Sequence, residues 1–433
     1  MKHLFTAVFC LYFFSAFSQA NLRRCGTFDV MQYREQQQPG YLNQVRNCFS
    51  NAQQLARANK ANRSGNDTVY YVQLVFHVVY TSAAENIPDS VIYSQVEVLN
   101  EDYRRLNADT VRTRPEFLPV AGDARIQFYL ANTDPDGNPT NGITRTAGNG
   151  GIIGFNPFQE NMKSAAMGGK DPWPTDRYVN IWVCNVLNGL GILGYSYPPS
   201  NAPNWPAGST TDSAKQGVVL HYPVVGRNFS APIDPTVAGG KSLTHELGHY
   251  FGLRHIWGDS TGCNNDDGIS DTPFASDASQ QTCDTVINSC PDAPTDWHDM
   301  IENYMDYSDD RCLNMFTVEQ IGIMRAMLQT SRAGVATTAV PTGIKSETDD
   351  FETIQLYPNP STGAVYLNVQ VKSGMNYSYE VYNAIGQKLL SENDLRSAIH
   401  SRSIDLSNQP SGIYFVKVMC GGQMVTKKFQ LVK

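Results

Sequence analysis

The sequence predicts an α+β protein with two folded units: a twisted sheet packed with helices, followed by a small all-β sandwich. Apolar strands and amphipathic helices alternate over residues 66–333, as expected for a sheet covered by helices. Residues 334–350 are rich in Thr, Gly and charged side chains and predict a linker. Short alternating strands separated by turn residues then fill residues 351–433. At 433 residues, the chain is long enough for two to four domains.

The first unit opens on a strong strand pattern at 70–80, and a helix is predicted at 88–106. Three further apolar runs bounded by turn residues predict strands at 126–130, 179–183 and 218–222. A second helix is predicted at 241–251. This order of elements predicts an open twisted sheet backed by two helices.

The second helix carries the most informative run of the chain, His-Glu-Leu-Gly-His-Tyr-Phe-Gly-Leu-Arg-His at 245–255. His245 and His249 lie one turn apart on one helical face, so both imidazoles reach one metal ion. Gly252 permits the left-handed turn that ends the helix, and His255 then returns as a third ligand. Glu246 approaches the metal without being a ligand. The spacing is typical of a catalytic zinc site, and the alternative is a core helix with scattered histidines.

Regular patterns stop after the third histidine. Residues 256–312 are rich in Asp, Gly, Pro and Cys, so disulfides and ions take the place of a large core. In an oxidising compartment the four cysteines of this region allow three pairings: Cys263, Cys283, Cys290 and Cys312. A last helix is predicted at 317–331, with Thr317 as its N-cap.

The N-terminus predicts export. Residues 1–20 form a signal peptide, with an apolar run from Leu4 to Phe17 and cleavage after Ala20; the alternative is a retained membrane anchor. The other apolar runs are too short for a transmembrane segment. Residues 21–65 are polar, contain little core material and predict a pro-segment. The net charge of −8 gives no support to nucleic-acid binding.

A second motif, Asn303-Tyr304-Met305-Asp306-Tyr307, follows the histidine run. Together the two motifs resemble the metzincin peptidases, and specifically the pappalysin family, over most of residues 66–332. The resemblance implies that Met305 forms a hydrophobic floor under the zinc. It also implies that Tyr307 contacts the metal or the oxyanion of the tetrahedral intermediate. The alternative for both residues is a plain role in the core.

The resemblance adds ions and covalent links to the irregular stretch. It implies a Ca²⁺ site made by the Asp267 carboxylate, the Ile269 carbonyl and the Thr272 hydroxyl; the alternative is a solvated acidic loop. It also implies the disulfides Cys263–Cys290 and Cys283–Cys312, which the spacing permits.

One position departs from the family pattern. Family members prefer a basic residue just after the scissile bond, and an acidic residue before the last cysteine helps to form that pocket. Arg311 stands at this position, which predicts repulsion of basic side chains and acceptance of acidic ones. The alternative is that Arg311 points to solvent.

A candidate for latency lies in residues 23–29. Their Arg-Cys-Gly run followed by Asp29 resembles the cysteine switch of metzincin zymogens, in which a thiolate fills the open zinc position. Cys25 is then a zinc ligand until the pro-segment is cut near Arg57 to Arg63. The alternative is a disulfide between Cys25 and Cys48.

The second unit resembles a different family. The run Leu-Tyr-Pro-Asn-Pro-Ser-Thr-Gly from Leu356, the strand at 412–416 and the terminal Lys427-Lys428-Phe429 resemble type IX secretion sorting domains. The resemblance implies the type IX machinery as a partner, and a secreted or cell-surface location reached through the periplasm. The alternative is a sandwich that binds carbohydrate or protein.

The sequence therefore predicts a secreted zinc-dependent endopeptidase that cleaves proteins or peptides and is made as a zymogen. The three histidines hold Zn²⁺, Glu246 takes and returns the proton, and Tyr307 helps the metal to stabilise the oxyanion. Two alternatives stay open. One is a surface adhesin on an inactive metzincin scaffold, and the presence of Glu246 argues against it. The other is a different metzincin branch, such as the serralysins or astacins.

Overall fold

The computed structural model forms two compact units, one ending at Ala339 and one beginning at Val340. It describes residues 23–37, 39–60, 68–148, 158–186, 191–199, 216–228, 233–339, 341, 351–371, 375–384, 386–396, 402–420 and 423–433. The signal peptide expected at 1–20 lies outside the described residues, as does most of the linker expected at 334–350. Among the described residues, no helix is both long and apolar enough to cross a membrane.

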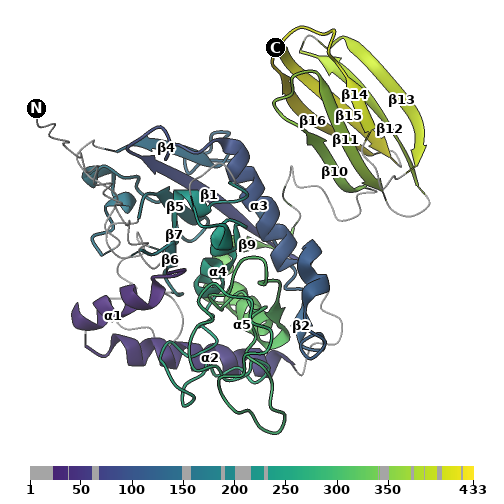
Figure 1. Ribbon diagram of the computed structural model, residues 1–433. Helices are drawn as coiled ribbons and strands as arrows, with labels where there is room; N and C mark the ends of the chain where they lie inside the picture. Colours follow the sequence, from purple (N-terminus) through teal and green to yellow (C-terminus); the bar gives the residue numbers. More distant parts are fainter. Residues whose placement is uncertain are drawn as a thin grey trace, which may run out of the picture. The chain divides into compact units, whose positions relative to one another are not determined.

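A seven-stranded sheet organises the first unit, with strand order β3-β1-β5-β7-β6 and with β4 and β9 also paired to β1 (Figure 1). Its strands are β1 (Tyr70–Tyr80), β3 (Ile126–Leu130), β4 (Ile143–Ala147), β5 (Val179–Cys184), β6 (Gly194–Ser196), β7 (Val218–His221) and β9 (Ala336–Thr337). Strands β1, β3, β4, β5 and β7 run parallel, whereas β6 is antiparallel to β7 at the edge. The predicted open sheet is confirmed, and β9 extends the first unit into the expected linker.

Three helices pack with this sheet: α3 (Asp89–Tyr103), α4 (Lys241–Tyr250) and α5 (Val318–Gln329). Their bounds fall within a few residues of the predicted ones. Thr317 caps α5 through a capping box with Gln320. Apolar side chains from α3, α4, α5 and the sheet form one buried core, which includes Leu99, Leu247 and Met324. This core fixes α4 against the sheet, and so fixes the histidines that α4 carries.

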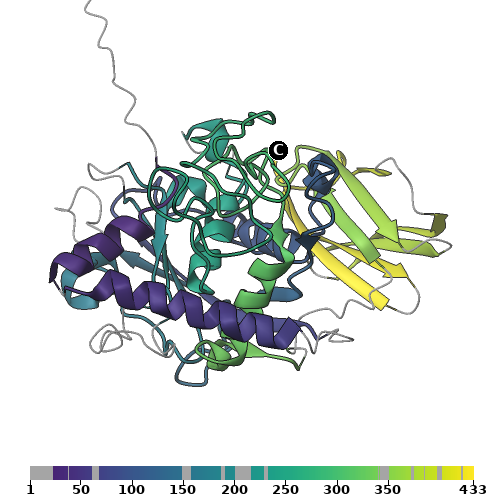
Figure 2. The same ribbon diagram turned by 90° about the horizontal axis from the view of Figure 1, so that it is seen from below.

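The expected pro-segment contains more structure than its polar sequence predicts. It forms α1 (Thr27–Gln37) and α2 (Tyr41–Lys60), and α2 lies along α5 (Figure 2). Among the side chains that the structure describes in these two helices, the buried apolar ones are Val30, Met31, Tyr41, Val45 and Ala56. The sequence analysis assigned no helix to this stretch, and the packing of these side chains on the folded unit seats both helices.

Residues 256–312 contain no helix or strand in the structure, as the sequence predicts. Two disulfides cross-link the stretch, Cys263–Cys290 and Cys283–Cys312, the pairings that the resemblance implies. The short strands β2 (Ala121–Gly122) and β8 (Phe316–Thr317) pair with each other next to it. Short 3₁₀ helices complete the unit: Ala108–Arg112, Asn161–Lys163, Ala165–Met167, Tyr222–Val224, Pro235–Val237 and Ala333–Val335.

The second unit is the predicted all-β sandwich, built from a three-stranded and a four-stranded antiparallel sheet. The smaller sheet has the order β10 (Phe351–Tyr357), β11 (Ala364–Val371), β14 (Arg402–Asp405). The larger sheet has the order β13 (Lys388–Arg396), β12 (Asn376–Asn383), β15 (Gly412–Cys420), β16 (Gln423–Leu431). Alternate residues of facing strands, such as Val365, Leu367 and Val416, form its separate core.

Candidate metal centre and active site

Helix α4 carries the first two histidines. Gly252 lets the chain turn back after the helix, and Gly248 leaves room for a neighbouring side chain. His245 and His249 lie one turn apart, and both are buried. Gly252 has φ 91°, a conformation that favours glycine, and it lets the chain reverse so that His255 returns to the same point. Gly248 lies against Met305, and a Cβ at this position would collide with the methionine sulfur.

The three imidazoles converge through their Nε2 atoms. The distances between these atoms are 3.1 Å for His245 and His249, 3.0 Å for His249 and His255, and 3.3 Å for His245 and His255. Two nitrogens each about 2.0–2.1 Å from a tetrahedral zinc ion lie about 3.3 Å apart. The three side chains therefore fit one zinc ion.

The opposite nitrogens of the rings fix the tautomer. His245 Nδ1 lies 2.7 Å from the Tyr304 carbonyl oxygen, and His249 Nδ1 lies 2.9 Å from the Leu253 carbonyl oxygen. A carbonyl only accepts hydrogen bonds, so each Nδ1 carries the proton and each Nε2 keeps its lone pair. Burial lowers the pKa of His249 to about 3, which keeps its ring neutral.

The third ring has a different support. Asp259 Oδ1 lies 2.5 Å from His255 Nδ1, an orientation that exposes the His255 Nε2 lone pair to the centre. Trp257 stacks on the imidazole, with ring centroids 4.4 Å apart and planes at 12°. The sequence reasoning missed both residues. An acidic residue four positions after the third histidine was the available signal for Asp259.

Cys25 completes the cluster from the other end of the chain. The ligand atoms of Cys25 and the three histidines all lie within 4.8 Å of one another. Cys25 is buried and is a free cysteine, so the alternative Cys25–Cys48 disulfide is not formed. Burial and the neighbouring Glu246 raise the pKa of its thiol well above the usual value. A metal cation at the centre opposes this shift, because a coordinating thiol is deprotonated.

Glu246 lies at the same centre and is buried. Burial raises the pKa of its carboxyl to about 8. Thr27 donates a hydrogen bond from Oγ1 to Glu246 Oε2 over 3.0 Å, and the same hydroxyl accepts one from Ser196 N over 3.0 Å. Thr27 was not singled out from the sequence, because only the fold brings it to a residue 219 positions away.

The residues of the second motif lie beneath and beside the histidines. Met305 is buried against α4 at Gly248. The Tyr307 ring lies 5.1 Å from the His255 ring, measured between centroids. Its hydroxyl donates to the carbonyl oxygen of Cys25 over 3.1 Å. The structure therefore brings Met305 and Tyr307 to the predicted centre.

The N-terminal segment runs along edge strand β6, and the Arg24 side chain, like that of Cys25, is buried in the protein. Arg23 pairs with Ile192 in a parallel bridge, and Gly26 N donates to the Gly194 carbonyl oxygen over 2.8 Å. Between them, the fully buried Arg24 guanidinium lies 2.7 Å from Asp310 Oδ1 and donates to the Ser308 carbonyl oxygen over 2.7 Å. Asp310 was also missed from the sequence.

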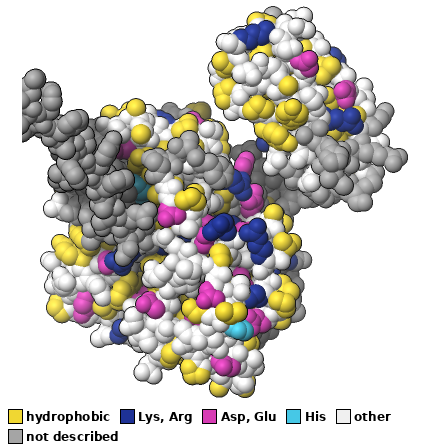
Figure 3. Space-filling model, viewed as in Figure 1, with side chains coloured by type: hydrophobic (Ala, Val, Ile, Leu, Met, Phe, Trp, Pro, Cys, Tyr) yellow, Lys and Arg dark blue, Asp and Glu magenta, His cyan; other side chains and the backbone are white. Residues whose placement is uncertain are grey.

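Arg311 differs sharply from its neighbour. Its side chain is 71% exposed and pairs with Asp309, whereas Asp310 is buried. On one face of the first unit, basic and acidic side chains lie intermixed on the surface (Figure 3). The geometry favours the alternative interpretation, in which Arg311 points to solvent.

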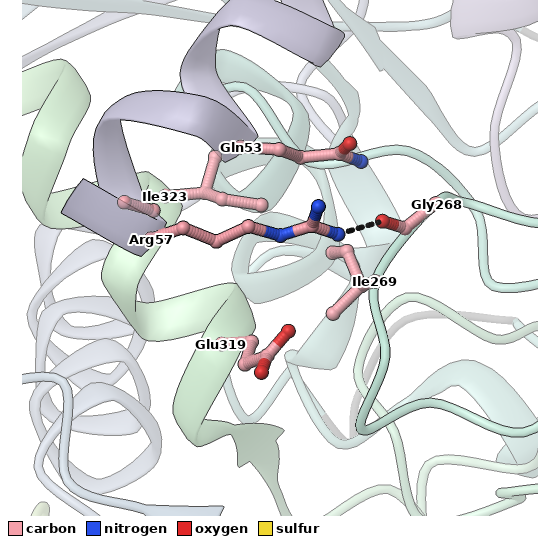
Figure 4. A pocket seen from close by; sticks show the side chains of 7 residues that line it. Gln53, Arg57, Gly268, Ile269, Glu319 and Ile323 are labelled. Atoms are coloured by element: carbon pink, nitrogen blue, oxygen red, sulfur yellow. Dashed lines mark hydrogen bonds between the residues drawn. The ribbon is translucent and has the colours of Figure 1, made fainter. Parts of the chain in front are cut away.

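The residues of the candidate Ca²⁺ site lie together. Thr272 Oγ1 lies 2.8 Å from Asp267 Oδ1 and 2.9 Å from the Ile269 carbonyl oxygen. Asp267 Oδ2 is buried and has no hydrogen-bond partner among the described residues. Gln53 of α2 donates to the Asp267 carbonyl oxygen over 2.8 Å, and Arg57 donates to the neighbouring Gly268 carbonyl oxygen (Figure 4).

The fold and the converging histidines define a metallopeptidase of the metzincin type. The chain belongs to the pappalysin family: residues 160–329 match the model described as "Pregnancy-associated plasma protein-A". Residues 355–432 match the model described as "Secretion system C-terminal sorting domain". The protein is therefore a peptidase that is secreted or held at the cell surface, with a type IX sorting module.

Relatives and solved structures agree with this assignment. An "Extracellular metalloprotease" of Pyricularia oryzae is 32% identical over 264 residues, covering 60% of this chain and 75% of the relative. "Extracellular metalloprotease 1" of Coccidioides posadasii is 33% identical over 267 residues, covering 61% and 78%.

Two solved structures of a Tannerella forsythia protein are similar to the first unit. Mature mirolysin in complex with a cleaved peptide is 40% identical, with a TM-score of 0.56, and covers 62% of this chain and 96% of that chain. A promirolysin mutant is 37% identical, with a TM-score of 0.62, and covers 72% of this chain and 97% of that chain.

Proposed function

We propose that the protein is a zinc-dependent endopeptidase whose metal ligands are His245, His249 and His255. The observation that carries this proposal is the convergence of three lone-pair Nε2 atoms at zinc spacing beside a buried glutamate. Both the tautomers and the distances suit zinc.

Glu246 is the proposed general base and acid. A zinc ion held by the histidines supplies a Lewis acid that polarises the scissile carbonyl and acidifies a water molecule. Glu246 accepts the proton from this water and delivers it to the leaving amine. Once Cys25 leaves, the Tyr307 hydroxyl becomes available to donate to the oxyanion.

We assign preference for a basic residue just after the scissile bond to Asp310, in place of the Arg311 hypothesis. Arg24 directly precedes Cys25, whose sulfur lies at the metal centre, and the Arg24 guanidinium is buried against Asp310. A substrate arginine in the same place would make the same charge-assisted contact.

Latency is proposed to rest on residues 21–65 as a pro-segment, with Cys25 as the fourth zinc ligand. Support comes from the position of its sulfur in the histidine cluster. The larger share of this chain covered by promirolysin than by mature mirolysin agrees with it. Thr27 adds a second barrier to catalysis, because its hydroxyl is hydrogen-bonded to the Glu246 carboxylate that must accept the proton.

Two further assignments complete the proposal. A Ca²⁺ ion at Asp267, Ile269 and Thr272 would supply the cation that the buried Asp267 carboxylate lacks. The C-terminal sandwich is proposed to be read by the type IX secretion machinery, and proteins or peptides are the substrates.

Replacing Glu246 by Ala tests the function. Cleavage of a protein substrate by the activated enzyme should fall by at least about 1000-fold, because the proton acceptor is lost. Zinc content, measured by atomic absorption, should stay at one per chain, because the three ligands remain. A matched control is Glu97→Gln on the exposed face of α3, which should change neither quantity. Retained proteolysis in Glu246→Ala would contradict the assigned base, whereas no proteolysis by the activated unaltered protein would favour the inactive-scaffold alternative.

A further inference from the structure

A second arginine of the N-terminal segment is held by a carboxylate, at the other end of edge strand β6. Arg34 of α1 donates to Glu160 Oε2 over 3.2 Å and to the Tyr197 hydroxyl over 3.1 Å. Its guanidinium carbon lies 5.8 Å from the centroid of the Tyr197 ring. Tyr197 directly follows β6, whereas Glu160 comes from a turn far away in the sequence.

The groups that bind Arg34 are also held by contacts that do not involve Arg34. Glu160 is almost fully buried, with its side chain 1% exposed, and its Oε1 accepts from Lys163 over 2.8 Å. Lys163 in turn lies over the Tyr197 ring at 4.5 Å and the Tyr195 ring at 5.1 Å. A buried carboxylate with one oxygen held by an internal lysine presents the other in a defined direction.

The strand register places this site along the substrate path. Gly194 lies over Glu246, because a Cβ at Gly194 would stand 3.2 Å from Glu246 Cγ. Tyr197 lies three residues further along the chain, about 10 Å away at the rise of an extended strand. Arg24 and Asp310 lie at the opposite end of β6. At that end, Arg23 N donates a hydrogen bond to the Gly191 carbonyl oxygen.

We propose that Glu160 and Tyr197 form a second specificity subsite, which binds an arginine side chain about three residues before the scissile bond. The inference rests on the proposed function. If Asp310 binds the residue just after the scissile bond, the residues before the bond lie along β6 toward Tyr197. Loss of the pro-segment removes Arg34, and a substrate guanidinium then contacts Glu160 Oε2, the Tyr197 hydroxyl and the Tyr197 ring. The enzyme would thus select basic side chains on both sides of the cleaved bond.

The test uses the activated enzyme and peptides with arginine just after the scissile bond, together with a parallel set in which citrulline replaces that arginine. Arginine is compared with citrulline, which has a similar shape and no charge, at the second, third and fourth positions before the bond. Arginine should raise kcat/KM about tenfold at one of these positions. Glu160→Gln should remove this preference and Tyr197→Phe should reduce it about threefold, while the control Glu97→Gln leaves it unchanged.

The outcomes separate the two proposals. Equal cleavage of arginine and citrulline at all three positions, with arginine still required after the bond, overturns the second subsite alone. No cleavage, or no requirement for arginine after the bond, overturns the proposed function and with it the direction on which the subsite depends. The comparison of the two substrates in the unaltered enzyme stays valid even if Glu160→Gln, which leaves Lys163 without this partner, fails to fold.

Discussion

The two ends of the N-terminal segment hold the enzyme in different ways. At one end, Arg24, Cys25 and Thr27 are buried at groups that the proposed chemistry needs. Helix α2 instead packs along α5, and its Gln53 and Arg57 donate hydrogen bonds to backbone carbonyls of the Asp267–Gly268 loop. Under the proposed latency, the first contact blocks chemistry directly, whereas the second adds binding energy. Substitutions in the two regions should therefore have different consequences.

The largest effect is expected from Cys25→Ala. Structural zinc binding of about 10–16 kcal/mol over four ligands corresponds to about 3 kcal/mol for one, so activation of the proenzyme should speed up roughly 100-fold. The rate is measured by following conversion to the mature form on gels after a trace of active enzyme is added. Cys184→Ala, which removes another buried free thiol, is the control. An unchanged rate in Cys25→Ala would remove the cysteine switch.

A smaller effect is expected from Thr27→Val, which keeps the shape of the side chain and removes the hydroxyl. It deletes the hydrogen bond to the Glu246 carboxylate, worth about 1.5 kcal/mol, and the one accepted from Ser196 N, so activation should speed up at least about tenfold. Thr27→Ser restores the hydroxyl and should restore slow activation. Equal rates in the Val and Ser variants would show that the contact with Glu246 has no part in latency.

The smallest effect is expected from Gln53→Ala in α2. One hydrogen bond of about 1 kcal/mol is lost, so amide hydrogen exchange in α2 should become about fivefold faster. Exchange in residues 23–27 should not change, because the metal centre holds them independently. Equal acceleration in both regions would show that the segment opens as one cooperative unit, against the distinction drawn above.

Local sequence patterns predicted most helices and strands of the first unit well. They could not predict contacts between residues that lie far apart in the sequence. Helix α4 and the cap of α5 follow from residues a few positions apart, and so does the histidine cluster. The contact between Arg24 and Asp310 joins residues that only the fold brings together, so the motif comparison suggested Arg311 and not Asp310 as the specificity candidate. Helix α2 was missed because the polar composition of the stretch was weighed above its spacing, although Tyr41, Val45 and Ala56 fall at helical spacing.

X-ray absorption spectroscopy at the zinc edge of the intact proenzyme tests most directly whether the N-terminal segment closes the metal centre. The structure predicts three nitrogen ligands at about 2.0–2.1 Å and one sulfur at about 2.3 Å, the sulfur being lost in Cys25→Ala. A proenzyme that binds zinc with no sulfur in its coordination shell would contradict the proposal that Cys25 is the fourth ligand.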